Sequence, residues 1–304
     1  MNPGAAPALR LLGDALEHGI WRVPEVGSWI EAAAEPAATP GGAPGSADDE
    51  AARHQHLFGF CVPPLAGVFV DPEGRAGGVA ADRILTAAAG AGLNPSFLGD
   101  SAEHVSSVAR LVAGLLEVER KAASTAAFDA LAWVPSLAMA VRQEGGADYA
   151  ELLDVLAEVL VSVAVPGSAV LDDLPPPTGR SDAGVSDLAD WVTTHLGSGL
   201  YCGRGMLQRW GRAAGVPRGF GRRGLMAANL FRSAAHLEAM PELTKAIMTD
   251  ANVWAAYWDA RAKREDSAGV WARIWRDRIA RFQGTIEEIA VRIGSYSSSS
   301  DPWV

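Results

Sequence analysis

The apolar residues of this chain recur with the spacing of an amphipathic α-helix over most of its length, and segments that alternate like a β-strand are almost absent. The clearest case is residues 147–164, where Leu152, Leu153, Leu156, Val159, Leu160 and Val163 follow this spacing. Similar patterns predict helices over 7–20, 26–35, 79–91, 101–119, 124–143, 186–196, 203–214, 222–234, 239–262 and 267–293. Because the residues are 49% hydrophobic, the chain can bury a substantial core. We therefore predict an all-α fold of about ten helices.

Stretches rich in proline and glycine interrupt these helices. Residues 35–50, "EPAATPGGAPGSADDE", are too poor in apolar side chains to pack and predict a linker. Residues 56–78 are dense in helix breakers and predict an extended loop with a turn at "DPEG". Three consecutive prolines in 171–184 predict a stiff connector.

These breaks predict the domain organisation. We expect variable N-terminal helices and a linker over residues 1–50, followed by a single helical domain over 51–293. The connector divides that domain into two halves, and 294–304 form a flexible tail.

Charge and cysteine usage exclude some partners and compartments. The net charge of −10 argues against a nucleic-acid partner, which requires a basic surface. Cys61 and Cys202 form no C-x-x-C pair and predict two free thiols in a reducing compartment. No secretory signal is visible, and no apolar run approaches the ~18 residues that span a bilayer. We expect a cytoplasmic protein without stable membrane insertion, either a monomer or a homodimer.

Motifs that carry chemistry are scarce. The six histidines show no zinc-binding spacing, and neither a P-loop nor a G-x-S-x-G motif occurs. We therefore expect no metal, no cofactor and no catalytic activity. Two segments carry unbalanced charge: 145–190 has nine acidic residues and one basic residue, whereas 204–232 has seven arginines and no acidic residue. Both patterns fit either solvated helix faces or recognition surfaces of opposite sign.

Glu103 and His104 stand side by side where a helix is predicted to begin. With Asp100 as N-cap, Glu103 falls at position N3, the arrangement of a capping box. His104 then lies half-buried at N4, with one ring nitrogen bonded to a nearby carbonyl. This helix-capping interpretation and a binding role are compatible, because a capping glutamate can still offer one carboxylate oxygen to a ligand.

Three segments occur in an order that resembles the TorD/DmsD/NarJ family of molybdoenzyme maturation chaperones. The loop "LFGFCVPPLAGVFVDPEGRAGG" (57–78) is similar to the family's "LF…PPYES.F.DPEG..GG" loop. The segment 100–104, "DSAEH", stands where the family has an "E-P-x-D-H" motif, and "DALAWVPSL" (129–137) matches a helix with a conserved Trp and Pro. The resemblance extends through the Trp-rich C-terminal segment and covers roughly 50–290.

The resemblance implies an all-helical, non-catalytic cytoplasmic chaperone. Such a protein binds the N-terminal leader, often a twin-arginine signal peptide, of the catalytic subunit of a molybdenum oxidoreductase. It holds that partner while the molybdopterin cofactor is inserted, before export or assembly. The residues expected to line the leader-binding groove are Glu103, His104, Trp133, Pro135, Phe69, Pro63 and Pro64.

Two alternatives from other classes remain open at this point. One is a helical enzyme that uses Glu103 and His104 as an acid–base pair. The other is a regulatory scaffold that binds a nucleotide on the arginine-rich segment 204–232.

Overall fold

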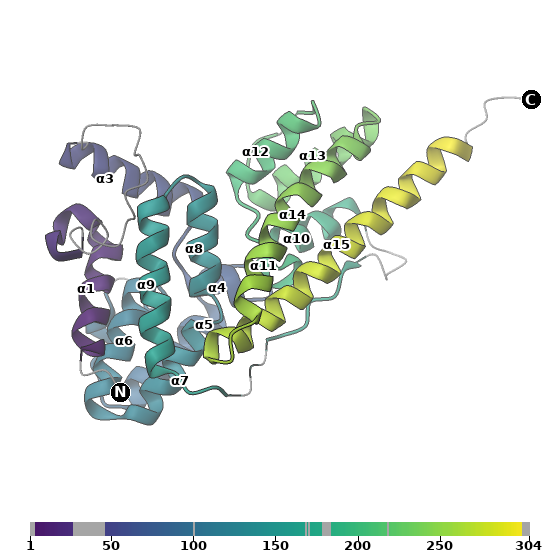
Figure 1. The fold of residues 1–304 in the computed structure, drawn as a ribbon. Coiled ribbons are helices and arrows are strands. Elements are labelled where there is room, and N and C mark those ends of the chain that lie inside the picture. The colour runs from purple at the N-terminus through teal and green to yellow at the C-terminus, as the bar shows by residue number, and fades with distance from the viewer. Residues whose placement is uncertain are drawn as a thin grey trace, which may run out of the picture. The chain divides into compact units, whose positions relative to one another are not determined.

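The structure is a computed structural model that describes residues 4–26, 46–99, 101–167, 169, 171–177, 184–217 and 219–299, apart from the side chains of Pro95, Phe97 and 291–299. The regular structure of this part of the chain is helical, with fourteen α-helices and no strand (Figure 1). The prediction of an all-α fold is confirmed. More helices form than the expected ten, because short ones occur within predicted loops and one predicted helix divides in two.

The described residues fall into two compact units. Unit 1 lies within 1–170 together with 264–271, and unit 2 lies within 171–263 together with 272–304. The division therefore comes at the beginning of the predicted connector 171–184.

The helices of unit 1 are α1 (Ala5–His18), α3 (Ala47–His56), α4 (Ala66–Val70), α5 (Gly78–Gly90), α6 (Val105–Val118), α7 (Arg120–Ala130), α8 (Val134–Gln143) and α9 (Ala147–Val163). Those of unit 2 are α10 (Val185–Thr193), α11 (His195–Ser198), α12 (Arg204–Ala213), α13 (Arg223–His236) and α14 (Met240–Ala262). Helix α15 (Ser267–Ser299) begins in unit 1 and continues in unit 2. Shorter turns are the 3-10 segments Ile20–Arg22 and Pro95–Leu98 and the π-helical turn Leu57–Cys61.

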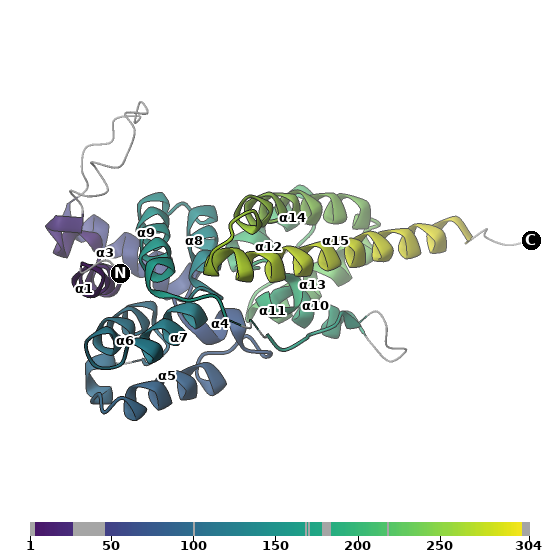
Figure 2. The same cartoon turned by 60° about the horizontal axis from the view of Figure 1, so that its bottom comes forward.

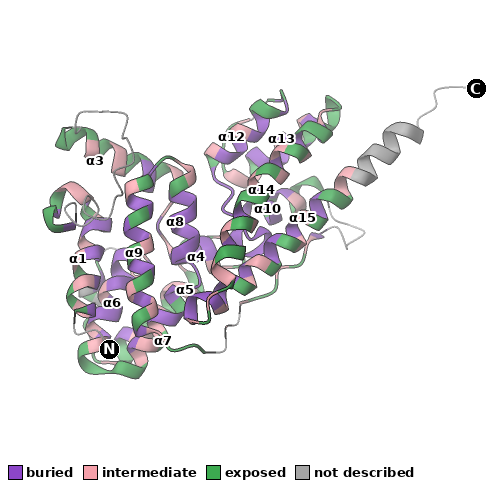
Figure 3. Ribbon diagram, in the orientation of Figure 1, coloured by how far each residue is buried: buried purple, intermediate pink, exposed green. Residues whose placement is uncertain are grey.

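In unit 1, helix α6 packs against α1 and α7, and α8 packs against α9 (Figures 1 and 2). Leu9, Leu12 and Leu16 form the buried stripe of α1. The α8 helix is buried over most of its length (Figure 3). Burial of each large aliphatic side chain contributes about 1.5–3 kcal/mol, so α1 is an integral part of this core.

The predicted boundary near residue 50 is therefore wrong for α1, which belongs to unit 1 and not to a separate N-terminal segment. Helix α3 also begins inside the predicted linker, because Ser46 caps it: its hydroxyl accepts the N–H of Asp49 at 3.2 Å. The rest of that linker and the predicted helix 26–35 lie almost wholly outside the described residues. At the other end, α15 continues past the expected boundary at residue 293.

The predicted helix 124–143 divides into α7 and α8 at a turn over residues 131–133. Trp133 is the N-cap of α8, and Pro135 occupies its first turn. Proline is accepted there because its missing N–H would have no intrahelical partner, whereas in a continuous helix it would break a hydrogen bond.

Among the described residues, one stretch, Arg120–Gln143, is long and apolar enough to cross a membrane by composition alone. However, 78% of its most apolar window is buried, and core helices of globular domains pass the same test.

Aromatic side chains of α14 and α15 form the core of unit 2. Trp254, Trp258 and Trp275 are buried, and the ring centroids of His195 and Trp275 lie 4.3 Å apart. The Arg278 guanidinium donates to the carbonyl oxygens of Leu196 and Asp172. The Trp-rich segment of the sequence is thus explained by core packing.

Candidate functional site

The carboxylate of Glu103 is the polar centre of the region where the three motif segments meet. The residue is only 3% exposed. Its Oε2 accepts the N–H of Gly67 at 2.9 Å, and its Oε1 accepts the N–H of Gly77. A buried charge is tolerated only where hydrogen bonds replace its hydration, and these two amides do so. Because Gly77 is the N-cap of α5 and Gly67 belongs to α4, Glu103 ties both helices to the residues that precede α6.

Backbone hydrogen bonds hold the same loop from a second direction. The N–H of Ala66 donates to the Glu103 carbonyl at 3.1 Å, and the N–H of Val105 donates to the Pro64 carbonyl at 2.9 Å. Leu65 and His104 form an isolated antiparallel bridge between these contacts. The loop therefore has a defined register against the start of α6.

Gly67 allows this close approach. A Cβ at this position would overlap the carbonyl oxygen of Arg75 and lie 2.7 Å from Glu103 Oε2. Since the Arg75 carbonyl is backbone, it cannot move aside as the end of a flexible side chain would. Only glycine fits here.

His104 is the N-cap of α6. Its Nδ1 accepts the N–H of Ser106 at 3.2 Å and lies 2.7 Å from the Ser106 hydroxyl oxygen. Burial lowers the pKa of His104 to about 4, so the ring is neutral at pH 7 and its proton is assigned to Nε2.

The predicted capping box is wrong, because α6 begins at Val105 and Glu103 precedes the helix instead of occupying N3. Asp100, the expected cap, lies outside the described residues.

The apolar members of the predicted groove lie in the interior. Phe69 is fully buried and stacks on Trp133, with ring centroids 6.1 Å apart. Pro64 and Pro135 are also buried, and Pro63 is half-buried. The structure therefore brings the loop, the Glu103 segment and the α8 helix together, but these side chains form a core instead of an open groove. Their contact with a leader peptide stays a prediction.

Helix α5 is the solvent-facing part of this region. Ala88 is its one fully buried residue. Val79 is 56% and Leu85 39% exposed, and exposed Asp82 lies between them. The spacing of three places Val79, Asp82 and Leu85 along one ridge of the helix. Figure 2 shows α5 beside α6 and α7 at the edge of the unit.

The turn before α5 adds carboxylates to this surface. Asp71 Oδ1 accepts the N–H of Glu73 at 2.8 Å, and the exposed Glu73 side chain pairs with Arg75 at 2.8 Å. A Cβ at Gly78 would lie 3.2 Å from Asp71 Oδ2, so Asp71 is next to the first residue of α5. The sequence predicted the helix and the turn but not that both stay open to solvent. The signal was present, since α5 is rich in alanine and has few large apolar side chains.

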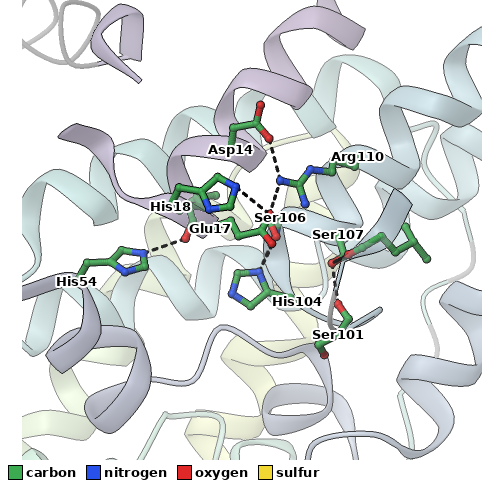
Figure 4. A network of polar contacts seen from close by, with 11 residues as sticks. Asp14, Glu17, His18, His54, Ser101, His104, Ser106, Ser107 and Arg110 are labelled. Atoms are coloured by element: carbon green, nitrogen blue, oxygen red, sulfur yellow. Dashed lines mark hydrogen bonds and ion pairs between the residues drawn. The ribbon is translucent and has the colours of Figure 1, made fainter. Parts of the chain in front are cut away.

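A polar network that the sequence did not predict joins α1 to α6 (Figure 4). The Arg110 guanidinium pairs with Asp14 at 2.8 Å and also with Glu17. The His54 Nε2 lies 3.1 Å from the Leu16 carbonyl oxygen, and burial lowers the pKa of His54. This network fixes the N-terminal helix against the helix that carries His104.

The acid–base pair required by the enzyme alternative is not favoured by this geometry. Both oxygens of Glu103 accept backbone amides, and the Nδ1 of His104 caps a helix. Within the described residues, no group of three or more His, Cys, Asp or Glu side chains is placed to hold a metal ion.

Comparison with family models, with curated proteins and with solved structures finds no match to this chain.

Proposed function

We propose that the protein is a non-catalytic cytoplasmic chaperone of the TorD-like kind. It binds the N-terminal, twin-arginine leader of a molybdenum oxidoreductase subunit and holds that subunit for molybdopterin insertion. One observation carries the proposal: the loop 57–78 binds the Glu103 carboxylate through Gly67 and Gly77 and stacks on Trp133 through Phe69, so it contacts both other segments of the sequence resemblance. This contact between segments that are distant in the sequence supports the proposal, because the resemblance rests on the same three segments.

The surface offered to the leader is the ridge of α5 with the turn before it. A twin-arginine leader consists of basic residues followed by a modest apolar stretch. Asp71 and Asp82 supply carboxylates for guanidinium groups, and arginine–carboxylate pairs can be bidentate and directional. Val79 and Leu85 supply exposed apolar surface, as in recognition of an amphipathic segment by a helix face.

In this arrangement Glu103 acts as a positioning residue. Its two hydrogen bonds hold the turn and the start of α5 in place but leave no carboxylate oxygen for the peptide. His104 likewise positions α6 through its cap.

The test is calorimetric titration of the full chain with a synthetic peptide that has two adjacent arginines followed by an apolar stretch. A second peptide, with both arginines replaced by glutamine, measures the charge contribution. We expect the first peptide to bind and the second to bind at least tenfold more weakly, since each charge-assisted bond contributes about 1.5–3 kcal/mol.

Variants locate the surface. Val79→Ser and Leu85→Ser should each weaken binding about fivefold, because each removes about 1 kcal/mol of apolar contact. Val118→Ser, at a position 58% exposed in the same unit, is the matched control and should bind like the parent. Equal binding of both peptides would overturn the proposal. Unchanged affinity in both α5 variants would show that the leader binds at a surface other than α5.

A further inference from the structure

The most exposed large apolar side chain in the described part of the chain is Phe220, at 93%. It stands between Gly219, with φ of +65°, and Gly221, with φ of +113°. Both glycines adopt a backbone conformation that other residues rarely take. Two such glycines around a single phenylalanine form a tight turn that presents the ring to solvent.

The turn is supported by the helix that follows it. A Cβ at Gly221 would lie 3.1 Å from Leu225 Cδ2, and one at Gly219 would lie 2.9 Å from Asn229 Nδ2. Leu225 and Asn229 are one helical turn apart on α13, so both glycines rest on the same face. Leu225 is itself 52% exposed. Phe220 and Leu225 are therefore two exposed apolar side chains at this turn and at the start of α13, and together they are called the apolar tip.

Arginines surround this tip in the sequence without an intervening acidic residue. Of the seven arginines in 204–232, Arg212 lies in the last turn of α12 and Arg222 directly precedes α13, and both are exposed. Neither side chain has an ion pair or hydrogen bond in the part of the chain that the structure describes. Arg223 lies over the ring of Tyr201 at 5.2 Å, and Arg232 donates to the Ser186 hydroxyl at 3.0 Å.

Of the acidic side chains near these helices, Asp190 is exposed and Asp250 is engaged in a hydrogen bond. The Asp190 carboxylate lies against Gly224 in the first turn of α13. Asp250 on α14 accepts the indole N–H of Trp210 at 2.8 Å. Arg222 is therefore an exposed basic side chain two residues from Phe220, in a segment, 204–232, whose sequence contains no acidic residue.

We propose that this apolar tip and its arginines dock the protein reversibly on an anionic lipid surface. The Phe220 ring would enter the boundary between headgroups and acyl chains, and Arg212 and Arg222 would meet lipid phosphates. An acidic protein partner is less suited, because the apolar atoms project from a turn and do not line a groove. The chain as a whole carries a charge of −10, so attraction to an anionic surface must come from this local patch. The inference is independent of leader binding and adds a second surface, in the other unit.

The test is co-sedimentation of the full chain with vesicles. Binding is expected to vesicles of phosphatidylcholine mixed with phosphatidylglycerol, and little binding to vesicles of phosphatidylcholine alone. Salt should weaken it, because exposed charges are screened over about 8–10 Å at moderate ionic strength.

Variants assign the binding to the patch. Phe220→Ser should lower the partition coefficient about tenfold, and Arg212→Glu or Arg222→Glu at least fivefold. Leu237→Ser, at a position 53% exposed in the same unit, and Arg22→Glu, at an exposed position in unit 1, are the matched controls. Circular dichroism melts verify that each variant is folded.

Three results would overturn the proposal: no sedimentation with anionic vesicles, equal sedimentation with both kinds of vesicle, or patch variants that bind like their controls. Binding of a polyglutamate peptide that competes fully with the vesicles would assign the patch to an acidic protein partner and would overturn it as well.

Discussion

Replacement of Glu103 by glutamine tests the contact that organises the candidate site. The parent carboxylate accepts two backbone amides, from Gly67 and Gly77, and is only 3% exposed. Glutamine keeps one acceptor oxygen but turns an NH₂ group toward the other amide, so that two donors face each other. A hydrogen bond to a charged group contributes about 1.5–3 kcal/mol, and an unsatisfied buried donor costs a similar amount. We therefore expect Glu103→Gln to lower the free energy of unfolding of unit 1 by about 2–4 kcal/mol.

The assay is urea denaturation followed by circular dichroism, together with hydrogen exchange of the Gly67 and Gly77 amides. Both amides should be protected in the parent, and at least one should exchange much faster in the variant. Glu119→Gln is the matched control, because Glu119 is exposed and its side chain forms no cap hydrogen bond. If Glu103→Gln unfolds within about 0.5 kcal/mol of the control and both amides keep their protection, the carboxylate does not hold the loop and the reasoning is refuted.

Two further changes test the neighbouring contacts. Gly67→Ala should disrupt the loop, because the added Cβ would overlap the Arg75 carbonyl oxygen. Hydrogen exchange should then show loss of protection at the Gly77 amide, and an unchanged exchange pattern would contradict the prediction. His104→Ala should destabilise α6 by about 0.5–2 kcal/mol through loss of the cap, whereas His104→Asn should stay close to the parent in thermal melts. Burial lowers the pKa of His104 to about 4 in the folded chain. As the pH falls, the unfolded chain therefore takes up a proton on this histidine at a higher pH than the folded chain does. The contribution of neutral His104 to the free energy of unfolding should therefore be complete above about pH 6.5 and should decline by up to roughly 3 kcal/mol toward pH 4. A His104→Asn variant whose unfolding has the same pH profile as the parent would disprove this.

Where the local pattern determines a helix, the sequence predicts it well. Residues 147–164 were expected as a helix, and α9 spans Ala147–Val163, because its apolar side chains meet the core on every turn. The division between α7 and α8 was missed although Pro135 signals it in the sequence. Proline lacks the N–H that a continuous helix requires, so its position in the sequence indicates a break just before residue 135.

The candidate site was predicted less well, since its contacts join distant segments. Local spacing made Asp100 the cap and placed Glu103 inside the helix, whereas bonds to Gly67 and Gly77 hold Glu103 outside it. Those partners lie 36 and 26 residues away in the sequence, and no local pattern encodes them. The ion pair between Arg110 and Asp14 of α1 was not predicted for the same reason.

The central claim, leader-dependent binding of a molybdenum oxidoreductase subunit, is tested most directly in cells that produce the protein naturally. The tagged full chain is purified under mild conditions, and the co-eluting protein is identified by mass spectrometry together with the sequence of its N-terminus. We expect to recover a molybdenum oxidoreductase subunit that still carries its leader, and we expect deletion of the leader to abolish co-elution. Recovery of no such subunit, or retention of one that lacks its leader, would show that the protein does not bind through a leader.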